Sequence, residues 1–97
     1  MQSEARVPTA MGARYLAQLC KHFAHRLTVT HEGNSGSIEF PDGLCVLTAQ
    51  DNFLVMQLAA KDPETLDRLQ TVMDKHLERF AFREKPAITW QGDGLAA

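Results

Sequence analysis

In the segment LCVLTAQDNFLVMQLAAKDPETLDRL (residues 44–69), the apolar residues change from a period of two residues to a period of about 3.6 residues. Two short apolar runs come first, at 44–47 and 53–56, and turn-forming residues separate them at 50–52. Asp62 and Pro63 then mark the start of a helix, because aspartate can accept from free amides and proline needs no donor at the first position. The segment predicts two antiparallel strands followed by an amphipathic helix.

The helix is expected to continue to about residue 80 with one apolar stripe along it. The stripe consists of Leu66, Leu69, Met73, Leu77 and Phe80. A turn is expected at 84–86, followed by a short strand at 87–90 (AITW) and a flexible tail at about 92–97.

Upstream of residue 44 the period of two extends back to Leu27, and turn signals recur at 33–36 and 41–43. We therefore predict a four-stranded meander with strands near 27–32, 37–40, 44–49 and 53–60. Before the meander, residues 3–7 alternate between apolar and polar side chains, which predicts a strand that ends at Pro8. Thr9 is expected to cap a helix through residues 10–25. Its buried arc would contain Gly12, Leu16, Leu19, Cys20 and Phe23.

These elements predict an α+β fold in the order β-α-β-β-β-β-α-β. Two amphipathic helices can both bury their stripes only on one face of the antiparallel sheet, which makes a two-layer sandwich. A chain of 97 residues has one core, so we expect a single domain over residues 1–97.

Composition excludes several classes of function. The chain has 10 basic and 12 acidic residues, and a net charge of −2 disfavours nucleic acid as a partner. The longest apolar run is far too short for a membrane span, and residues 1–10 do not resemble a signal peptide, so we expect a cytoplasmic protein without a membrane partner. Cys20 and Cys45 are expected to stay reduced and to act as small apolar residues.

The strands at 44–47 and 53–56 are apolar on both faces, although an antiparallel sheet with one wet face should alternate. If one set of side chains faces the helices, the other set forms a patch on the open face of the sheet. That patch would be Leu44, Val46, Phe53 and Val55. We expect it to be the interface of a homodimer; the alternative is a set of scattered surface hydrophobic residues.

The segment LCKHFAHR (residues 19–26) holds Cys20, His22 and His25 but is not expected to be a metal site. On a helix Cys20 and His22 point about 200° apart, and His25 is expected to face solvent. His76 lies inside the apolar stripe of the second helix, where an imidazole needs a hydrogen-bond partner. His76 is interpreted either as a structural core histidine or, together with His22, as part of a ligand site.

Arg79 and Arg83 in ERFAFRE (residues 78–84) would lie one turn apart if the helix continued. They are interpreted either as part of a solvated, salt-bridged face or as a fork for a carboxylate or phosphate. The chain has no glycine-rich phosphate loop, nucleophile elbow or Cys-x-x-Cys motif, so no metal and no cofactor are expected.

Residues 14–26 (RYLAQLCKHFAHR) and 76–84 (HLERFAFRE) resemble the bacterial family called domain of unknown function 2218. The corner at 40–43 (FPDG) and the ending at 88–90 (ITW) are similar to that family as well. The resemblance implies a two-layer sandwich like the C-terminal domain of phosphohexomutases or a half of TATA-binding protein. Some relatives are fused to or lie beside siderophore-interacting flavoproteins, so the resemblance also implies an iron-uptake setting and a siderophore-related protein as a partner.

Three functional hypotheses stand on this sequence. The leading one is a non-enzymatic binding or accessory domain in iron or siderophore handling, with His22, His76, Arg79 and Arg83 as ligand-binding residues. The second is a small metal-binding protein or enzyme that uses His22 and His76. The third is a protein interaction adaptor without a ligand. Convergence of polar side chains in a pocket would favour a site, and a featureless helix layer would favour the adaptor.

Overall fold

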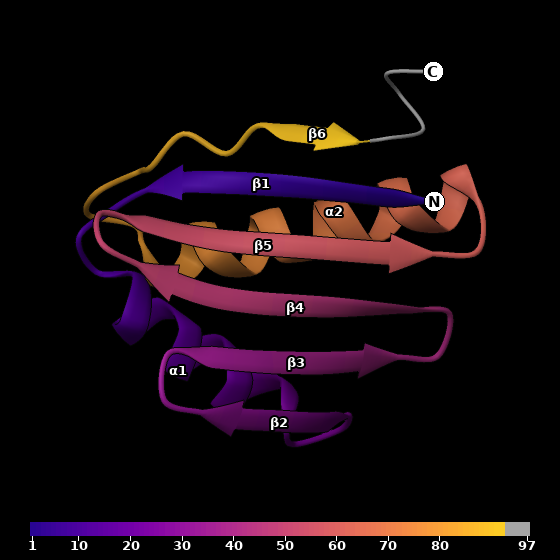
Figure 1. The fold of residues 1–97 in the computed structure, drawn as a ribbon, viewed down its shortest axis with the longest axis horizontal. Helices are drawn as coiled ribbons and strands as arrows, with labels where there is room; N and C mark the ends of the chain where they lie inside the picture. Colours follow the sequence, from indigo (N-terminus) through magenta and orange to yellow (C-terminus); the bar gives the residue numbers. More distant parts are fainter. Residues whose placement is uncertain (93–97) are drawn as a thin grey trace.

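The computed structural model describes residues 1–92, and the expected α+β order is confirmed (Figure 1). The chain forms β1 (Gln2–Pro8), α1 (Gly12–Phe23), β2 (Thr28–Glu32), β3 (Ser35–Phe40), β4 (Gly43–Gln50), β5 (Phe53–Ala60), α2 (Pro63–Phe80) and β6 (Trp90–Gly92). Within residues 1–92 no helix is both long enough and apolar enough to span a membrane.

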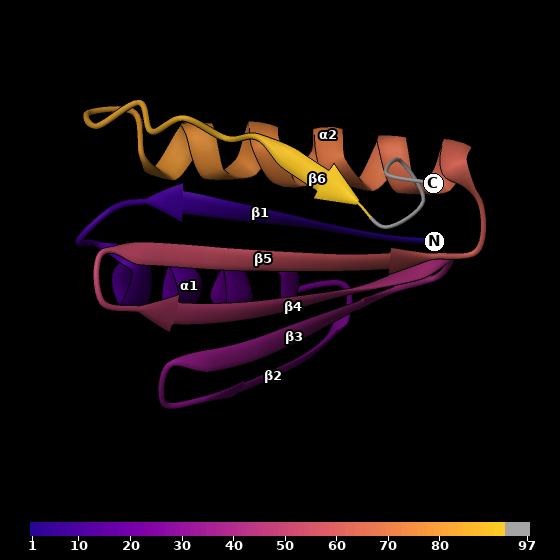
Figure 2. The same cartoon turned by 45° about the horizontal axis from the view of Figure 1, so that its top comes forward.

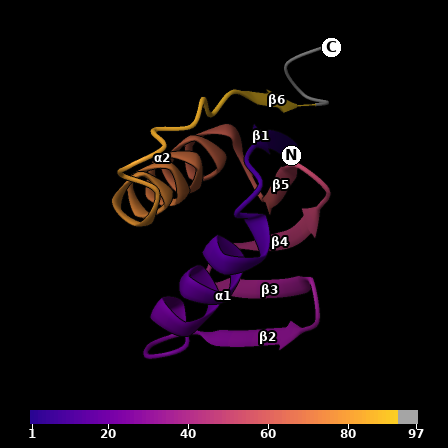
Figure 3. The same ribbon diagram turned by 90° about the vertical axis from the view of Figure 1, so that its left-hand side faces the viewer.

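The strands form one six-stranded antiparallel sheet in the order β2-β3-β4-β5-β1-β6. The meander therefore accounts for four neighbouring strands, and β1 lies between β5 and β6. Both helices cover the same face: α1 packs on β2, β3 and β4, while α2 packs mainly on β5 (Figure 3). Turning the molecule shows α2 running along β5 and β1 (Figure 2). The two-layer arrangement follows from the two apolar helix stripes.

The core lies between the sheet and the helices. Its sheet side alternates along β4 and β5, so that every second residue is buried. These residues are Cys45, Leu47, Leu54, Met56 and Leu58, each at most 1% exposed. The helices contribute the fully buried Leu16, Leu19, Leu69, Met73 and Leu77. Gly36 in β3 lets α1 approach closely, because a Cβ there would lie 2.6 Å from the Cys20 sulfur.

The start of α2 is as predicted, and the start of α1 is not. The Thr65 backbone N–H donates to Asp62 Oδ1 at 2.7 Å, so Asp62 caps α2 ahead of Pro63. At α1 the N-cap is Met11, which has no side-chain cap. Thr9 lies too early, and its hydroxyl instead accepts from the Met11 N–H at 3.0 Å and donates to Glu84 at 2.8 Å.

The final strand lies later than the sequence predicted. The strand expected at 87–90 is found at Trp90–Gly92, where Ser3 pairs with Gly92 and Ala5 with Trp90. The Trp90 indole N–H donates to Asp74 Oδ1 of α2 at 2.7 Å, which anchors the strand at this register. Of the predicted tail, Gly92 belongs to this strand and residues 93–97 lie outside the described residues.

Candidate functional site between the two helices

His22 and His76 lie next to each other, although 54 positions separate them in the sequence. His22 is the last residue but one of α1, and His76 lies one turn before the end of α2. Because both helices pack on one face of the sheet, their imidazole rings meet at a centroid distance of 4.8 Å and an interplanar angle of 52°. Both side chains are half-buried.

Aromatic rings surround this pair. Phe23 lies 4.7 Å from His76, and Phe80 lies 6.0 Å from His22, both as centroid distances. Phe23 also contacts Phe40 of β3, with centroids 5.6 Å apart. We call His22, His76, Phe23 and Phe80 the histidine cluster. Its apolar surroundings reduce the hydration of both imidazoles.

The hydrogen bonding of His76 determines its tautomer. Its Nδ1 lies 2.7 Å from the Val72 carbonyl oxygen, one turn earlier in α2. A carbonyl only accepts, so Nδ1 carries the proton, and Nε2 of the neutral ring has a free lone pair. No side-chain hydrogen bond within residues 1–92 uses that Nε2. The partner that the sequence analysis required for His76 is therefore its own helix, and one ring nitrogen stays free for a ligand.

The surroundings of His22 lower its pKa from the ordinary value of 6.5. Burial is the largest cause, and the charges of His76, Arg79 and His25 add to it. His22 is therefore a neutral imidazole near neutral pH and gains a proton only in more acidic solution. A bound anion would oppose all of these effects, so the protonation of His22 and the binding of an anion would favour each other.

The side chains of Cys20, His22 and His25 in the segment LCKHFAHR do not converge on one site. Cys20 is buried toward the sheet, with its sulfur 4.0 Å from the Thr30 carbonyl oxygen, and burial raises the pKa of its thiol. His25 is exposed beyond the end of α1. Among residues 1–92 no group of three or more His, Cys, Asp or Glu side chains is placed to hold a metal ion.

Arg79 and Arg83 do not lie one turn apart on one helix, as the interpretation of a fork required. Helix α2 ends at Phe80 with Ala81 as its C-cap, and Arg83 lies in the turn that follows. Arg79 acts on the histidine cluster through its charge, whereas Arg83 lines a neighbouring hollow of about 460 Å³. The hollow is bounded by Met11, Arg14, Tyr15, Gln18, Phe80, Phe82, Arg83 and Glu84. We call it the interhelical hollow.

Among the residues of this hollow that the sequence analysis did not single out are Arg14, Gln18 and Glu84. The first two had a signal, since Arg14, Gln18 and His22 are spaced by four and share one face of α1. Glu84 had none. Its carboxylate accepts hydrogen bonds from the hydroxyls of Tyr15 and Thr9, and these bonds lower its pKa.

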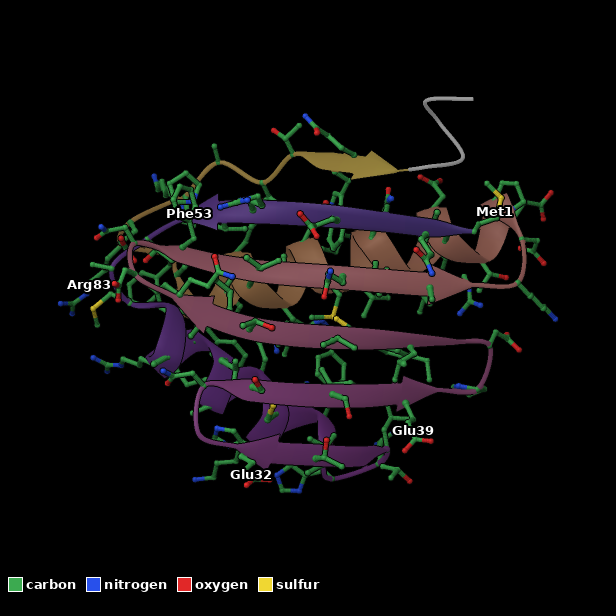
Figure 4. The ribbon with its side chains drawn as sticks, in the orientation of Figure 1. Met1, Glu32, Glu39, Phe53 and Arg83 are labelled. Atoms are coloured by element: carbon green, nitrogen blue, oxygen red, sulfur yellow. The ribbon has the colours of Figure 1, made fainter. Side chains whose placement is uncertain are left out.

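The four residues of the predicted apolar patch differ in their exposure on the open face of the sheet. Leu44 is 38% exposed and Val46 and Phe53 are half-buried, while neighbouring side chains leave Val55 only 7% exposed. The Arg6 guanidinium lies 5.0 Å from the centre of the Phe53 ring. Figure 4 shows this face, with Phe53 at one end of the strands and Glu39 at the other.

The chain is similar to known proteins in two of three comparisons. A family model described as an uncharacterized protein conserved in bacteria (DUF2218) matches residues 4–91. The NMR structure of PA4090 from Pseudomonas aeruginosa is similar with a TM-score of 0.79 and 37% sequence identity, covering 93% of this chain and 94% of that chain. No curated protein matches the chain.

Proposed function

The chain belongs to the bacterial DUF2218 family, and from this premise we propose that it is a small binding or accessory domain that holds an anionic ligand at its histidine cluster. One observation carries the proposal: the two helices bring the ring centroids of His22 and His76 to 4.8 Å from each other. A plain helix layer would not need two half-buried imidazoles there. Imidazoles with free nitrogens beside an arginine are typical of a polar binding site.

The electrostatics favour an anion over a cation. Burial, and then the charges of His76, Arg79 and His25, already disfavour a further proton on His22. A ligand with negative charge would offset the part that comes from these charges, gain charge-assisted hydrogen bonds and favour the cationic form of His22.

We propose iron or siderophore handling in the cytoplasm as the setting, which is the setting that the family resemblance implies. A ferric chelate with net negative charge supplies its own iron ligands. It would therefore not require three or four protein ligands around the metal, as a bare ion would. A siderophore-related protein would be the matching partner.

The test is an NMR titration of the full chain with gallium(III) citrate, a diamagnetic stand-in for an anionic ferric chelate. The expected result is saturable shifts centred on His22, His76 and Arg79. His22→Ala and His76→Ala should each weaken binding about tenfold or more, as loss of a charge-assisted contact predicts. His25→Ala is the matched control, because His25 is exposed beyond the same helix. Equal loss in all three variants, or shifts with citrate alone of the same size, would contradict the proposal.

A second candidate is a metal-binding protein or enzyme that uses His22 and His76, and the free Nε2 of His76 favours it. Two imidazoles without a third ligand hold zinc or ferrous iron only weakly. Calorimetry with zinc separates the two proposals: sub-micromolar, stoichiometric binding lost in both histidine variants would support this second candidate. If neither zinc nor gallium citrate binds, the third hypothesis, a protein interaction adaptor without a ligand, remains.

We also propose that the open sheet face joins two copies of the chain. Glu4 and Arg6 lie two positions apart on this face of β1, beside the apolar patch. A two-fold axis running across the strands would bring Arg6 of one protomer over Glu4 of the partner subunit. Such a self-complementary surface is what an isologous dimer requires.

A further inference from the structure

The interhelical hollow is formed where the N-terminal half of α1 meets the turn after α2. Its volume of about 460 Å³ lies within the range of small-molecule sites, roughly 300–1,000 Å³. Arg14, Tyr15 and Gln18 border it from α1, while Phe80, Phe82 and Arg83 border it from α2 and the turn. Arg83 marks this end of the molecule in Figure 4. The histidine cluster adjoins it through Phe80.

The hollow has an excess of positive charge. Arg14 and Arg83 are opposed by a single carboxylate, Glu84. Both hydroxyls that contact this carboxylate, from Tyr15 and Thr9, donate to the same oxygen, Oε1, and so tie Glu84 to the protein. Within the described residues neither arginine forms a salt bridge. Their guanidinium groups therefore remain available for a carboxylate on a ligand.

Flat apolar surfaces complete the hollow. Phe82 is 61% exposed and Met11 is 38% exposed, so the chain leaves two large hydrophobic side chains in water at this place. The Arg83 guanidinium lies 5.6 Å from the centre of the Phe82 ring, which gives one wall both a π-face and a cation. Aromatic rings stack well on such surfaces, usually in an offset or edge-to-face arrangement.

Gln18 provides a second, independent sign of a ligand. Its side-chain Oε1 is shielded from solvent and has no hydrogen-bond partner in residues 1–92. A shielded amide oxygen without a partner is unfavourable, so native proteins rarely keep one. A half-turn of the amide would exchange the positions of its oxygen and its NH₂ group. The side chain could then present either an acceptor or a donor to the hollow that it borders.

We infer that the interhelical hollow is a binding site for a small aromatic carboxylate. The carboxylate pairs with Arg14 and Arg83, the ring lies against Phe80 and Phe82, and the Gln18 amide takes up a polar substituent. Inorganic phosphate fits less well, because it leaves the apolar walls in water. This site shares Phe80 with the histidine cluster but uses different polar side chains, so it does not depend on the binding proposed there.

Benzoate is the probe for this inference, observed through the backbone amide signals of the isotope-labelled full chain. We expect saturable shifts in residues 11–18 and 80–84. Benzamide has the ring without the charge and acetate has the charge without the ring, so each should bind about tenfold more weakly than benzoate. Acetate binding as strongly as benzoate would overturn the inference.

Variants locate the site. Arg83→Gln and Phe82→Ala change exposed side chains and should each weaken benzoate binding about tenfold. The matched control is Arg26→Gln, an exposed arginine beyond the opposite end of α1. Equal weakening by Arg26→Gln and Arg83→Gln would show general attraction of anions and would refute the site. His22→Ala should leave benzoate binding unchanged while it weakens gallium citrate, so the two proposals can fail separately.

Discussion

The hydroxyl of Tyr15 donates a hydrogen bond to the carboxylate of Glu84, which lies 69 positions later in the chain. Tyr15 belongs to α1 and is 6% exposed, and Glu84 lies in the turn after α2. The same carboxylate accepts from Thr9, the residue that follows β1. One acidic side chain therefore ties the turn after α2 to the start of α1 and determines the shape of the interhelical hollow.

Tyr15→Phe should lower the free energy of unfolding near neutral pH, because it removes one hydrogen bond to a carboxylate. Glu84 has a lowered pKa, so the stabilisation is present above its unfolded pKa and is lost as the pH falls through its folded pKa. Urea denaturation of both proteins from neutral to acidic pH should therefore show a difference that shrinks with acid. A Glu84→Gln background is the control, and there the pH dependence of the difference should disappear.

Asp62→Ala should lower the urea midpoint, because it removes the acceptor for the Thr65 amide at the start of α2. Asp62→Asn keeps a side-chain acceptor and should be destabilised less. The bond to Thr65 lowers the pKa of Asp62, so its contribution is lost as the pH falls through the folded pKa. The gap between wild type and Asp62→Ala should close in acid. An unchanged midpoint at neutral pH would show that the cap contributes nothing to stability.

The pKa of His22 should rise when the positive charges near it are removed. His76→Phe keeps an apolar ring against His22 and removes one of those charges, and Arg79→Gln removes another. NMR titration of the His22 ring protons measures both shifts. Burial remains the largest cause, so neither substitution should restore the ordinary value of 6.5. A pKa that neither substitution changes would mean that the two helices are not close in solution.

Leu44→Glu should convert the proposed dimer into monomers. Leu44 is 38% exposed on the open face, so the substitution costs the monomer little but would place a charge in a dehydrated interface at a cost of several kcal/mol. Phe53→Glu should act in the same direction and would also remove the ring beneath Arg6. Thr71→Glu, at an exposed position of α2 in the other layer of the sandwich, is the control. Sedimentation equilibrium at about 100 μM decides the question, and a monomeric wild-type protein there would rule out the interface.

Local patterns in the sequence predicted most of the secondary structure. The Asp62–Pro63 start of α2 depends on neighbours in the chain, so it could be read without a structure. The period of two in 44–60 divided the side chains of β4 and β5 into two sets, which the structure places on opposite faces of the sheet, although both sets are apolar at 44–47 and 53–56. Thr9 was assigned wrongly as a cap, because its hydroxyl has a distant partner, Glu84, that no local pattern reveals.

The candidate sites needed the tertiary structure. Helical spacing separated His22 from Cys20 on α1 and assigned His76 to the apolar stripe of α2, but spacing says nothing about the distance between two helices. That distance depends on side-chain packing, including the contact that Gly36 permits between β3 and α1. The place of β6 depends in the same way on Trp90 reaching Asp74.

The sequence alone thus determined the order of the elements, their buried faces and the residue types available for a site, because these follow from periods of two and 3.6 along one chain. Only the tertiary structure decided that His22 meets His76 and that Arg83 joins Arg14 and Gln18 rather than Arg79. The physical reason is that contacts between residues far apart in the chain depend on how whole elements pack. Packing is a property of the complete core and of no single segment.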